Sequence, residues 1–142
     1  MISYEIDFYS WTQEQANLLK SGQFNSLDIP NLIEEIETMG RSEKRELESR
    51  LTVLLLHLLK WKYQEVRRGR SWELSIIEQR LRLAETLEEN PGLKSKLGEI
   101  LTKAYTFAVI QASRETKISR HVFPETCPWS LDEITNDKFY PE

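Results

Sequence analysis

The amino-acid sequence predicts an all-α protein, and two observations carry this prediction. Apolar residues recur at spacings of three and four along most of the chain, and no segment sustains an alternation of apolar and polar residues. The five glycines and five prolines fall at a few places, where helices are expected to end. With 142 residues, 39% hydrophobic and 30% charged, we expect one domain over residues 1–142. It would be an antiparallel bundle of four main helices (residues 1–119) with a tail over residues 120–142.

Composition and charge exclude several classes of protein. The single cysteine excludes an internal disulfide, and the acidic start of the chain lacks the apolar segment of a signal peptide. The longest mostly apolar run, residues 53–59, is far shorter than the roughly 20 residues that span a bilayer. The net charge of -4 argues against a chain that is basic throughout. We therefore expect a cytoplasmic protein that does not contact membranes.

The first helix is expected to begin near Tyr4 or Ser10 and to end at Lys20. Ser10 is a suitable N-cap residue, and Gly22 follows directly after the predicted end.

The second helix is expected to follow Asp28 as its N-cap, with Pro30 in its first turn, and to continue to about Arg68. A straight helix of that length would measure about 60 Å, at about 1.5 Å per residue. A compact domain of this size has a radius of gyration of only about 14–15 Å. The sequence therefore predicts a bend or break in this helix near Gly40, a residue that is weak inside helices.

The same helix carries a wide apolar arc in its second part. The arc consists of Leu47, Leu51, Leu54, Leu55, Leu58 and Trp61, widened by Leu56 and Leu59 on its two flanks. Such an arc is typical of the central helix of a bundle or of a helix at a dimer interface.

Two further helices and a short one are expected. Ser71 would cap a helix over residues 72–89, and Asn90 would cap a helix that runs to about Ile118. The latter carries a smooth ridge that a neighbouring helix can approach closely, formed by Ala104, Ala108 and Ala112. In the tail, Ser130 and Glu133 form a capping box. The tail is also expected to pack back onto the bundle, because it holds four aromatic residues: Phe123, Trp129, Phe139 and Tyr140.

Several segments together resemble a known family. They are YEIDFYSW at 4–11, EQA at 14–16, LD at 27–28, NLIEEIETMG at 31–40, SE at 42–43, HLLKW at 57–61, SW at 71–72, EQR at 78–80 and FPETCP at 123–128. In this order and spacing they resemble the bacterial, largely cyanobacterial family called domain of unknown function twenty-nine. The resemblance implies a small helical bundle and a cyanobacterial or related source. It implies no reaction and no catalytic residues.

A cluster of glutamates at positions 34, 35 and 37 is the first candidate for chemistry. Acidic clusters on helices can bind Mg²⁺, as in all-α nucleotide pyrophosphatases, whose pattern is Glu-Glu-x-x-Glu followed by Glu-x-x-Asp. Here Thr38 interrupts the first half, and residues 85–89 lack the aspartate of the second. The alternative is a solvated face near a helix start, with Glu37 paired to Arg41 four residues later.

His57 and Cys127 lack the partners that catalysis or metal binding needs. No carboxylate or second histidine stands at ligand spacing from His57, which favours a half-exposed residue in a polar network. His121 precedes Cys127 by six residues, but the prolines around them favour an irregular, packed segment over a catalytic pair. We therefore assign no catalytic residue, no metal ligand and no cofactor.

The segment over residues 60–72 has an unusual charge. It holds five cations and one anion, interleaved with aromatic residues, and its candidate binding residues are Lys60, Trp61, Lys62, Tyr63, Arg67, Arg68, Arg70 and Trp72. Cations beside aromatic rings suit phosphate contacts with base stacking, and Arg80 and Arg82 would extend the patch. The alternative is structural: cations at a helix end that pair with acids elsewhere, and tryptophans that plug the core.

These patterns favour a non-catalytic protein-interaction or regulatory module that self-associates or binds a protein partner. The first alternative is a nucleic-acid-associated protein that uses residues 60–72. The second is a Mg²⁺-dependent nucleotide hydrolase that uses Glu34 and Glu37.

Overall fold

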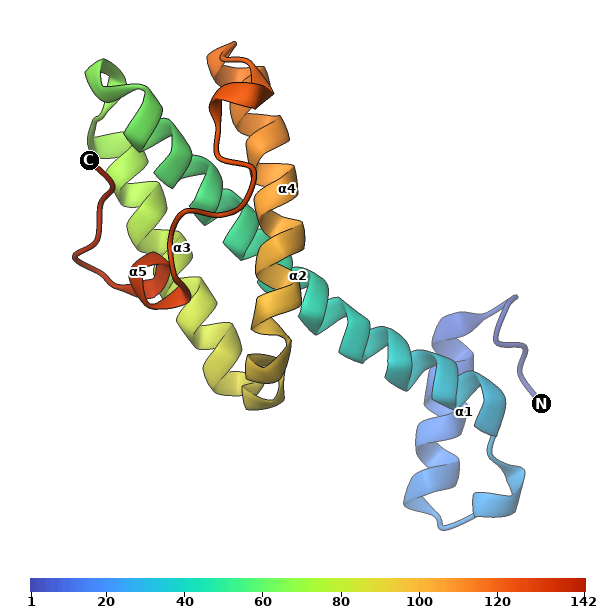
Figure 1. Ribbon diagram of the computed structural model, residues 1–142. Helices are drawn as coiled ribbons and strands as arrows, with labels where there is room; N and C mark the ends of the chain where they lie inside the picture. The colour runs from blue at the N-terminus through green and yellow to red at the C-terminus, as the bar shows by residue number, and fades with distance from the viewer. The chain divides into compact units, whose positions relative to one another are not determined.

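The computed structural model describes residues 1–142 and confirms the all-α prediction (Figure 1). Its α-helices are α1 (Phe8–Lys20), α2 (Ile29–Tyr63), α3 (Arg70–Glu89), α4 (Leu97–Thr116) and α5 (Leu131–Thr135). Short 3-10 turns lie between them, at Phe24–Ser26, Glu65–Arg67, Pro91–Lys96 and Arg120–Val122. The chain divides into two compact units, the N-terminal unit (Met1–Arg41) and the C-terminal unit (Ser42–Glu142).

Helix α2 is continuous through Gly40, so the break expected there does not occur. A glycine inside a helix costs only about 1 kcal/mol, which the surrounding helical hydrogen bonds can offset. Residues 29–41 of α2 belong to the N-terminal unit and residues 42–63 to the C-terminal unit, so the helix need not fit within the dimensions of a single compact body. The helix ends at Tyr63 rather than near Arg68, since Glu65–Arg67 form a separate 3-10 turn. A single folding domain over residues 1–142 stays a prediction.

Three of the predicted N-caps are wrong, at the starts of α1, α3 and α4. Helix α1 is capped by Asp7, whose Oδ1 accepts a hydrogen bond from the Ser10 backbone at 3.1 Å. Ser10 thus lies inside the helix. Helix α3 begins at Arg70 after Gly69, which has no side chain to cap it, so Ser71 also lies in the first turn. Helix α4 begins at Leu97 after Lys96, whereas Asn90 precedes the 3-10 turn Pro91–Lys96 and makes no side-chain capping hydrogen bond there. The capping box of Ser130 and Glu133 is confirmed at the start of α5.

In the N-terminal unit, α1 packs antiparallel to the first part of α2. Trp11 Nε1 donates to Asp28 Oδ2 at 2.9 Å, and the Asp28 backbone N–H donates to Gln15 Oε1 at 2.8 Å. Tyr4, before α1, reaches Glu35 further along α2. Trp11 and Gln15 are the buried residues of this unit.

In the C-terminal unit, the second part of α2 packs with α3 and α4 in an up-down-up bundle. Helices α2 and α4 run parallel, because three ion pairs join residues at a constant offset: Lys44–Glu99, Glu48–Lys103 and Lys60–Glu115. Helix α3 returns between them in sequence and runs antiparallel, so that Asn90 at its end donates to Glu43 on α2 at 3.2 Å.

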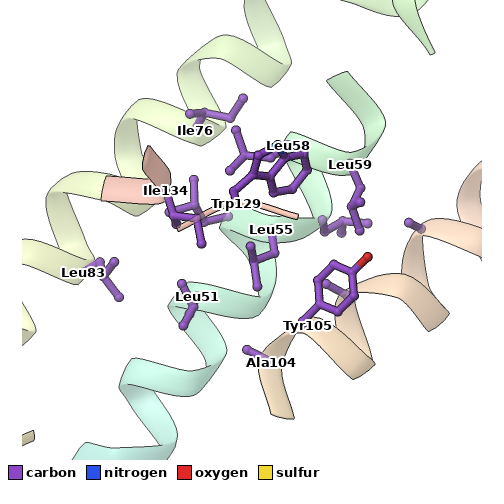
Figure 2. Packing of buried hydrophobic residues seen from close by; sticks show 14 of the residues in the cluster. Leu51, Leu55, Leu58, Leu59, Ile76, Leu83, Ala104, Tyr105, Trp129 and Ile134 are labelled. Atoms are coloured by element: carbon purple, nitrogen blue, oxygen red, sulfur yellow. The ribbon is translucent and has the colours of Figure 1, made fainter. Parts of the chain in front are cut away.

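The leucine arc of α2 forms the centre of this bundle. Leu51, Leu55, Leu58 and Leu59 are fully buried, and Figure 2 shows them between side chains of α3, α4 and the tail. Of the two interpretations of the arc, the structure therefore supports the central bundle helix. The alanine ridge of α4 is also fully buried, as expected for a close approach of helices.

The tail packs back onto the bundle, as predicted. Trp129 and Ile134 are buried in the core (Figure 2). Arg80 of α3, only 4% exposed, holds the tail through its backbone: Nε donates to the Ile134 carbonyl at 2.8 Å and Nη2 to the Phe139 carbonyl at 2.7 Å. A longer contact of 3.4 Å joins Nη1 to the Asp137 carbonyl. The expectation that Arg80 extends an exposed basic patch is therefore wrong.

Candidate functional site

The cations of the segment 60–72 divide into paired and free ones. Lys60 is mostly buried, with Nζ 3.0 Å from Glu115 Oε1 and 4.9 Å from the ring centre of Trp72. Arg68 donates from Nε to the Trp61 carbonyl at 2.6 Å. Both side chains are therefore committed to contacts within the C-terminal unit.

The aromatic side chains of this segment are partly buried, and two of them, Trp61 and Tyr63, pack against aromatic residues of the tail. Trp61 packs against Tyr140 of the tail, with ring centres 4.9 Å apart, and the Arg68 guanidinium lies 5.4 Å from the Trp61 ring centre. Tyr63 packs edge-on against Phe123. These contacts match the structural alternative, in which the aromatic residues belong to the core and its rim. They engage the rings of Trp61 and Tyr63, while Trp72, which is partly buried, has the Lys60 ammonium over its ring.

Three cations of the segment are exposed and make no ion pair: Lys62, Arg67 and Arg70. Arg70 and Arg68 line a hollow of about 480 Å³ at the start of α3, together with Trp61, Gly69, Glu73 and Leu74. Glu73 adds a negative charge to this hollow, so it is not a purely basic site. The segment could therefore attract an anionic ligand by charge, but it does not form a well-defined pocket for one.

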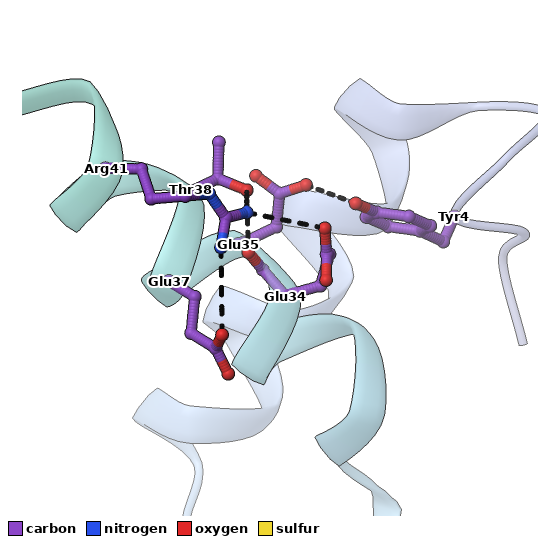
Figure 3. Close-up of polar contacts among 6 residues, drawn as sticks. All are labelled: Tyr4, Glu34, Glu35, Glu37, Thr38 and Arg41. Carbon is purple, nitrogen blue, oxygen red and sulfur yellow. Dashed lines mark hydrogen bonds and ion pairs between the residues drawn. The ribbon is translucent and has the colours of Figure 1, made fainter. Parts of the chain in front are cut away.

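The glutamates of α2 contact an arginine and a tyrosine. Figure 3 shows Glu34 and Glu37 on either side of the Arg41 guanidinium, each 3.7 Å from it, while Glu35 accepts a hydrogen bond from the Tyr4 hydroxyl. That hydrogen bond, with the negative charge of Glu35, raises the pKa of Tyr4 to about 12. No group of three or more His, Cys, Asp or Glu side chains is placed to hold a metal ion. The geometry therefore gives the hydrolase alternative no ion site.

His57 and Cys127 are both half-buried. His57 Nδ1 lies 2.8 Å from the Val53 carbonyl, one helical turn earlier, and burial lowers the pKa of the imidazole. Cys127 packs against the core, its Sγ 3.5 Å from the Trp129 carbonyl, and burial raises the pKa of the thiol. A thiol with a raised pKa is a poor nucleophile at neutral pH.

Sequence reasoning missed the exposed apolar surface of the N-terminal unit. The large hydrophobic side chains exposed there are Met1, Ile6, Phe8, Tyr9, Leu19, Phe24, Ile29, Ile33, Ile36 and Met39. The signal was present in the spacing of Ile29, Ile33 and Ile36, which places them on one face of a helix. A smaller exposed row lies on α3 in the C-terminal unit, formed by Leu74, Ile77 and Leu81.

The comparison with known protein families agrees with the resemblance in the sequence. The family described as "Domain of unknown function DUF29" matches residues 3–140, nearly the whole chain. The chain belongs to the DUF29 family. The family description assigns no reaction, ligand or partner, so the function must be argued from this chain's own geometry. No curated protein and no solved structure matches the DUF29 chain significantly. None of its helices combines the length and the apolar character that a bilayer crossing requires.

Proposed function

We propose that this protein is a non-catalytic protein-interaction module that self-associates. The observation that carries the proposal is the imbalance of the N-terminal unit, in which ten large apolar side chains are exposed while only Trp11 and Gln15 are buried. Even this small interior is incomplete, because the buried Gln15 Nε2 has no hydrogen-bond partner. Helical units of about 40 residues usually need a disulfide, a metal or a partner chain to be stable.

The chemistry of the exposed surface also favours protein contacts. Contiguous exposed apolar surface of several hundred Å² on a soluble protein commonly marks a protein-binding site. The leucine arc no longer supports self-association, since it is buried within the C-terminal unit. The exposed apolar side chains of the N-terminal unit now carry this proposal.

Light scattering of the purified protein at tens of micromolar tests this proposal. We expect a mass larger than that of one chain, falling toward the monomer on dilution. A strict monomer that also captures nothing specific from a lysate of the source organism would refute it.

A second candidate function is binding of a polyanion, such as a nucleic acid, and the free charges of Lys62, Arg67 and Arg70 support it. Their contacts would be to phosphates, because the rings of Trp61 and Tyr63 are engaged elsewhere. Retention on heparin that weakens with salt and is lost in Arg67→Ala/Arg70→Ala would support this function. A flow-through at low salt would refute it.

A cytoplasmic location and a cyanobacterial source belong to the same proposal. The unpaired Cys127 is compatible with a reducing compartment, and the family resemblance supports the source. Fractionation of source cells tests the location.

A further inference from the structure

One part of the exposed apolar surface forms a continuous stripe on α2. It consists of Ile29, Ile33, Ile36 and Met39, which are 49%, 50%, 62% and 60% exposed. At 100° per residue these positions fall within about a third of the helix circumference. The polar contacts to this part of α2 lie on one flank of the stripe and leave it open: Trp11 and Gln15 of α1 contact Asp28, and Tyr4, before α1, contacts Glu35.

We propose that the stripe pairs with the same stripe of a second copy of this chain, the two helices running antiparallel about a two-fold axis near Ile36. This inference rests on the proposed function and specifies the surface, the partner and the orientation. Two observations support it: the area of the stripe and the charges on its other flank.

The area suits a partner of equal shape. Four side chains exposed by about half leave roughly 400 Å² of surface, about half of the ~800 Å² that each partner contributes to a standard interface. The remainder must come from the residues beside the stripe. In an isologous contact both copies contribute the same flanking residues, so the two shares of the interface are equal.

The charges beside the stripe suit an antiparallel pair, in which the acidic part of the flank in one copy faces the basic part of the same flank in the other. Glu34 and Glu37 precede Arg41 on α2 and lie close to its guanidinium (Figure 3). All three lie on the flank that α1 does not cover, and their side chains are about half exposed. In an antiparallel pair of helices, each flank faces the same flank of the other copy in the opposite direction. With the two-fold axis near Ile36, the Arg41 of each copy then lies about 4.5 Å along the helix axes from Glu34 of the other, within reach of its carboxylate. A parallel pair would instead bring this flank against the one that α1 occupies.

The first experiment tests the surface. Sedimentation equilibrium compares the wild type with Ile33→Glu/Ile36→Glu and with Leu81→Glu, a matched change in the exposed row of α3. We expect the double variant to weaken self-association at least thirtyfold, as loss of a central apolar anchor does, and Leu81→Glu to leave it unchanged. Unchanged far-UV circular dichroism would show that the double variant still folds.

These outcomes separate the two proposals. A monomeric wild type would refute self-association itself. A wild-type dimer that survives Ile33→Glu/Ile36→Glu, or that Leu81→Glu disrupts to the same extent, would overturn only the surface proposed here.

The second experiment tests the orientation by disulfide crosslinking in a Cys127→Ser background. Antiparallel pairing brings the two copies of position 36 together but separates the two copies of position 29 by about 20 Å along the helix axes. A disulfide requires Cα atoms within about 7 Å. We therefore expect Ile36→Cys to crosslink and Ile29→Cys not to. Crosslinking at position 29, or at neither position in a chain that still dimerises, would overturn the antiparallel pairing.

Discussion

Replacing Arg80 by alanine removes the cation that holds the C-terminal tail against α3. The two short hydrogen bonds, to the carbonyls of Ile134 and Phe139, join a charged donor to backbone oxygens. Each bond of this kind contributes about 1.5–3 kcal/mol net. The Arg80 guanidinium also lies 5.4 Å from the Tyr140 ring centre, a cation–π contact worth about 0.5–1 kcal/mol.

Burial of the charge offsets part of this gain. No carboxylate lies within ion-pair distance of Arg80, and burial lowers the pKa of its guanidinium, which shows that the charged form is penalised. Allowing for that penalty, we expect Arg80→Ala to reduce the free energy of unfolding of the C-terminal unit by about 3 kcal/mol. Since the lost contacts all lie on the tail, proteolytic cleavage within residues 130–142 should also accelerate.

Urea unfolding followed by circular dichroism, together with limited proteolysis read by mass spectrometry, measures both effects. Arg82→Ala is the matched control: this arginine is two residues away and half exposed, and its only ion pair is a surface one with Glu78, so the change should stay within about 0.5 kcal/mol. If Arg80→Ala were no more destabilising than Arg82→Ala, and its tail equally resistant to protease, the reasoning would be refuted.

Three further predictions concern single residues. Burial lowers the pKa of His57 below its ordinary 6.5, so just below this pH the imidazole is protonated more in the unfolded chain than in the folded one. The free energy of unfolding should therefore fall as the pH drops below about 6.5, and a slope that persists in His57→Gln would contradict this. Burial raises the pKa of the Cys127 thiol, so a thiol reagent at neutral pH should modify it slowly in the native protein and fast in urea; equal rates would contradict the packing. Gly40→Ala should stabilise the protein by about 0.5–1 kcal/mol, because a Cβ there lies in a helix and meets no atom within 4 Å. The comparison is Gly22→Ala, which should cost about 1–2 kcal/mol at its φ of 72°; thermal melts of both variants suffice, and the same sign for both would refute the assignment.

Most of the fold could be predicted from local patterns. The ends of helices at Lys20 and Glu89, the capping box at Ser130 and the buried alanines of α4 all follow from spacing and from residue preferences at helix termini. The N-cap of α1 could not be predicted in this way, because Asp7 and Ser10 are both good capping residues. The choice depends on where the backbone leaves the extended conformation, which residue preferences alone do not give.

The division into two units was not accessible to the same reasoning. Length and composition predict one domain over residues 1–142, which stays a prediction, and the expected break at Gly40 came from fitting the long second helix within it. The actual boundary falls after Arg41 while the helix continues, because hydrogen bonding along a helix is local and does not depend on which unit packs against it.

The role of each arginine and lysine near residues 60–80 could be predicted least. Arg80 and Arg82 are two positions apart in the same helix, yet one is buried beneath the tail and the other is at the surface. Lys60 likewise became a buried ion-pair partner of α4. The sequence shows where charged residues are concentrated along the chain. Their ion pairs and burial depend on tertiary contacts between helices and tail, which the sequence pattern does not give.

The hydrogen bonds of Arg80 to the tail affect how residues 134–139 can vary during evolution. The arginine recognises main-chain oxygens, which every amino acid supplies, and the side chains of Asp137 and Lys138 point into solvent. Substitutions at positions 137 and 138 are therefore compatible with intact hydrogen bonds from Arg80. We expect position 80 to vary much less, because no other side chain offers the same planar set of five N–H donors.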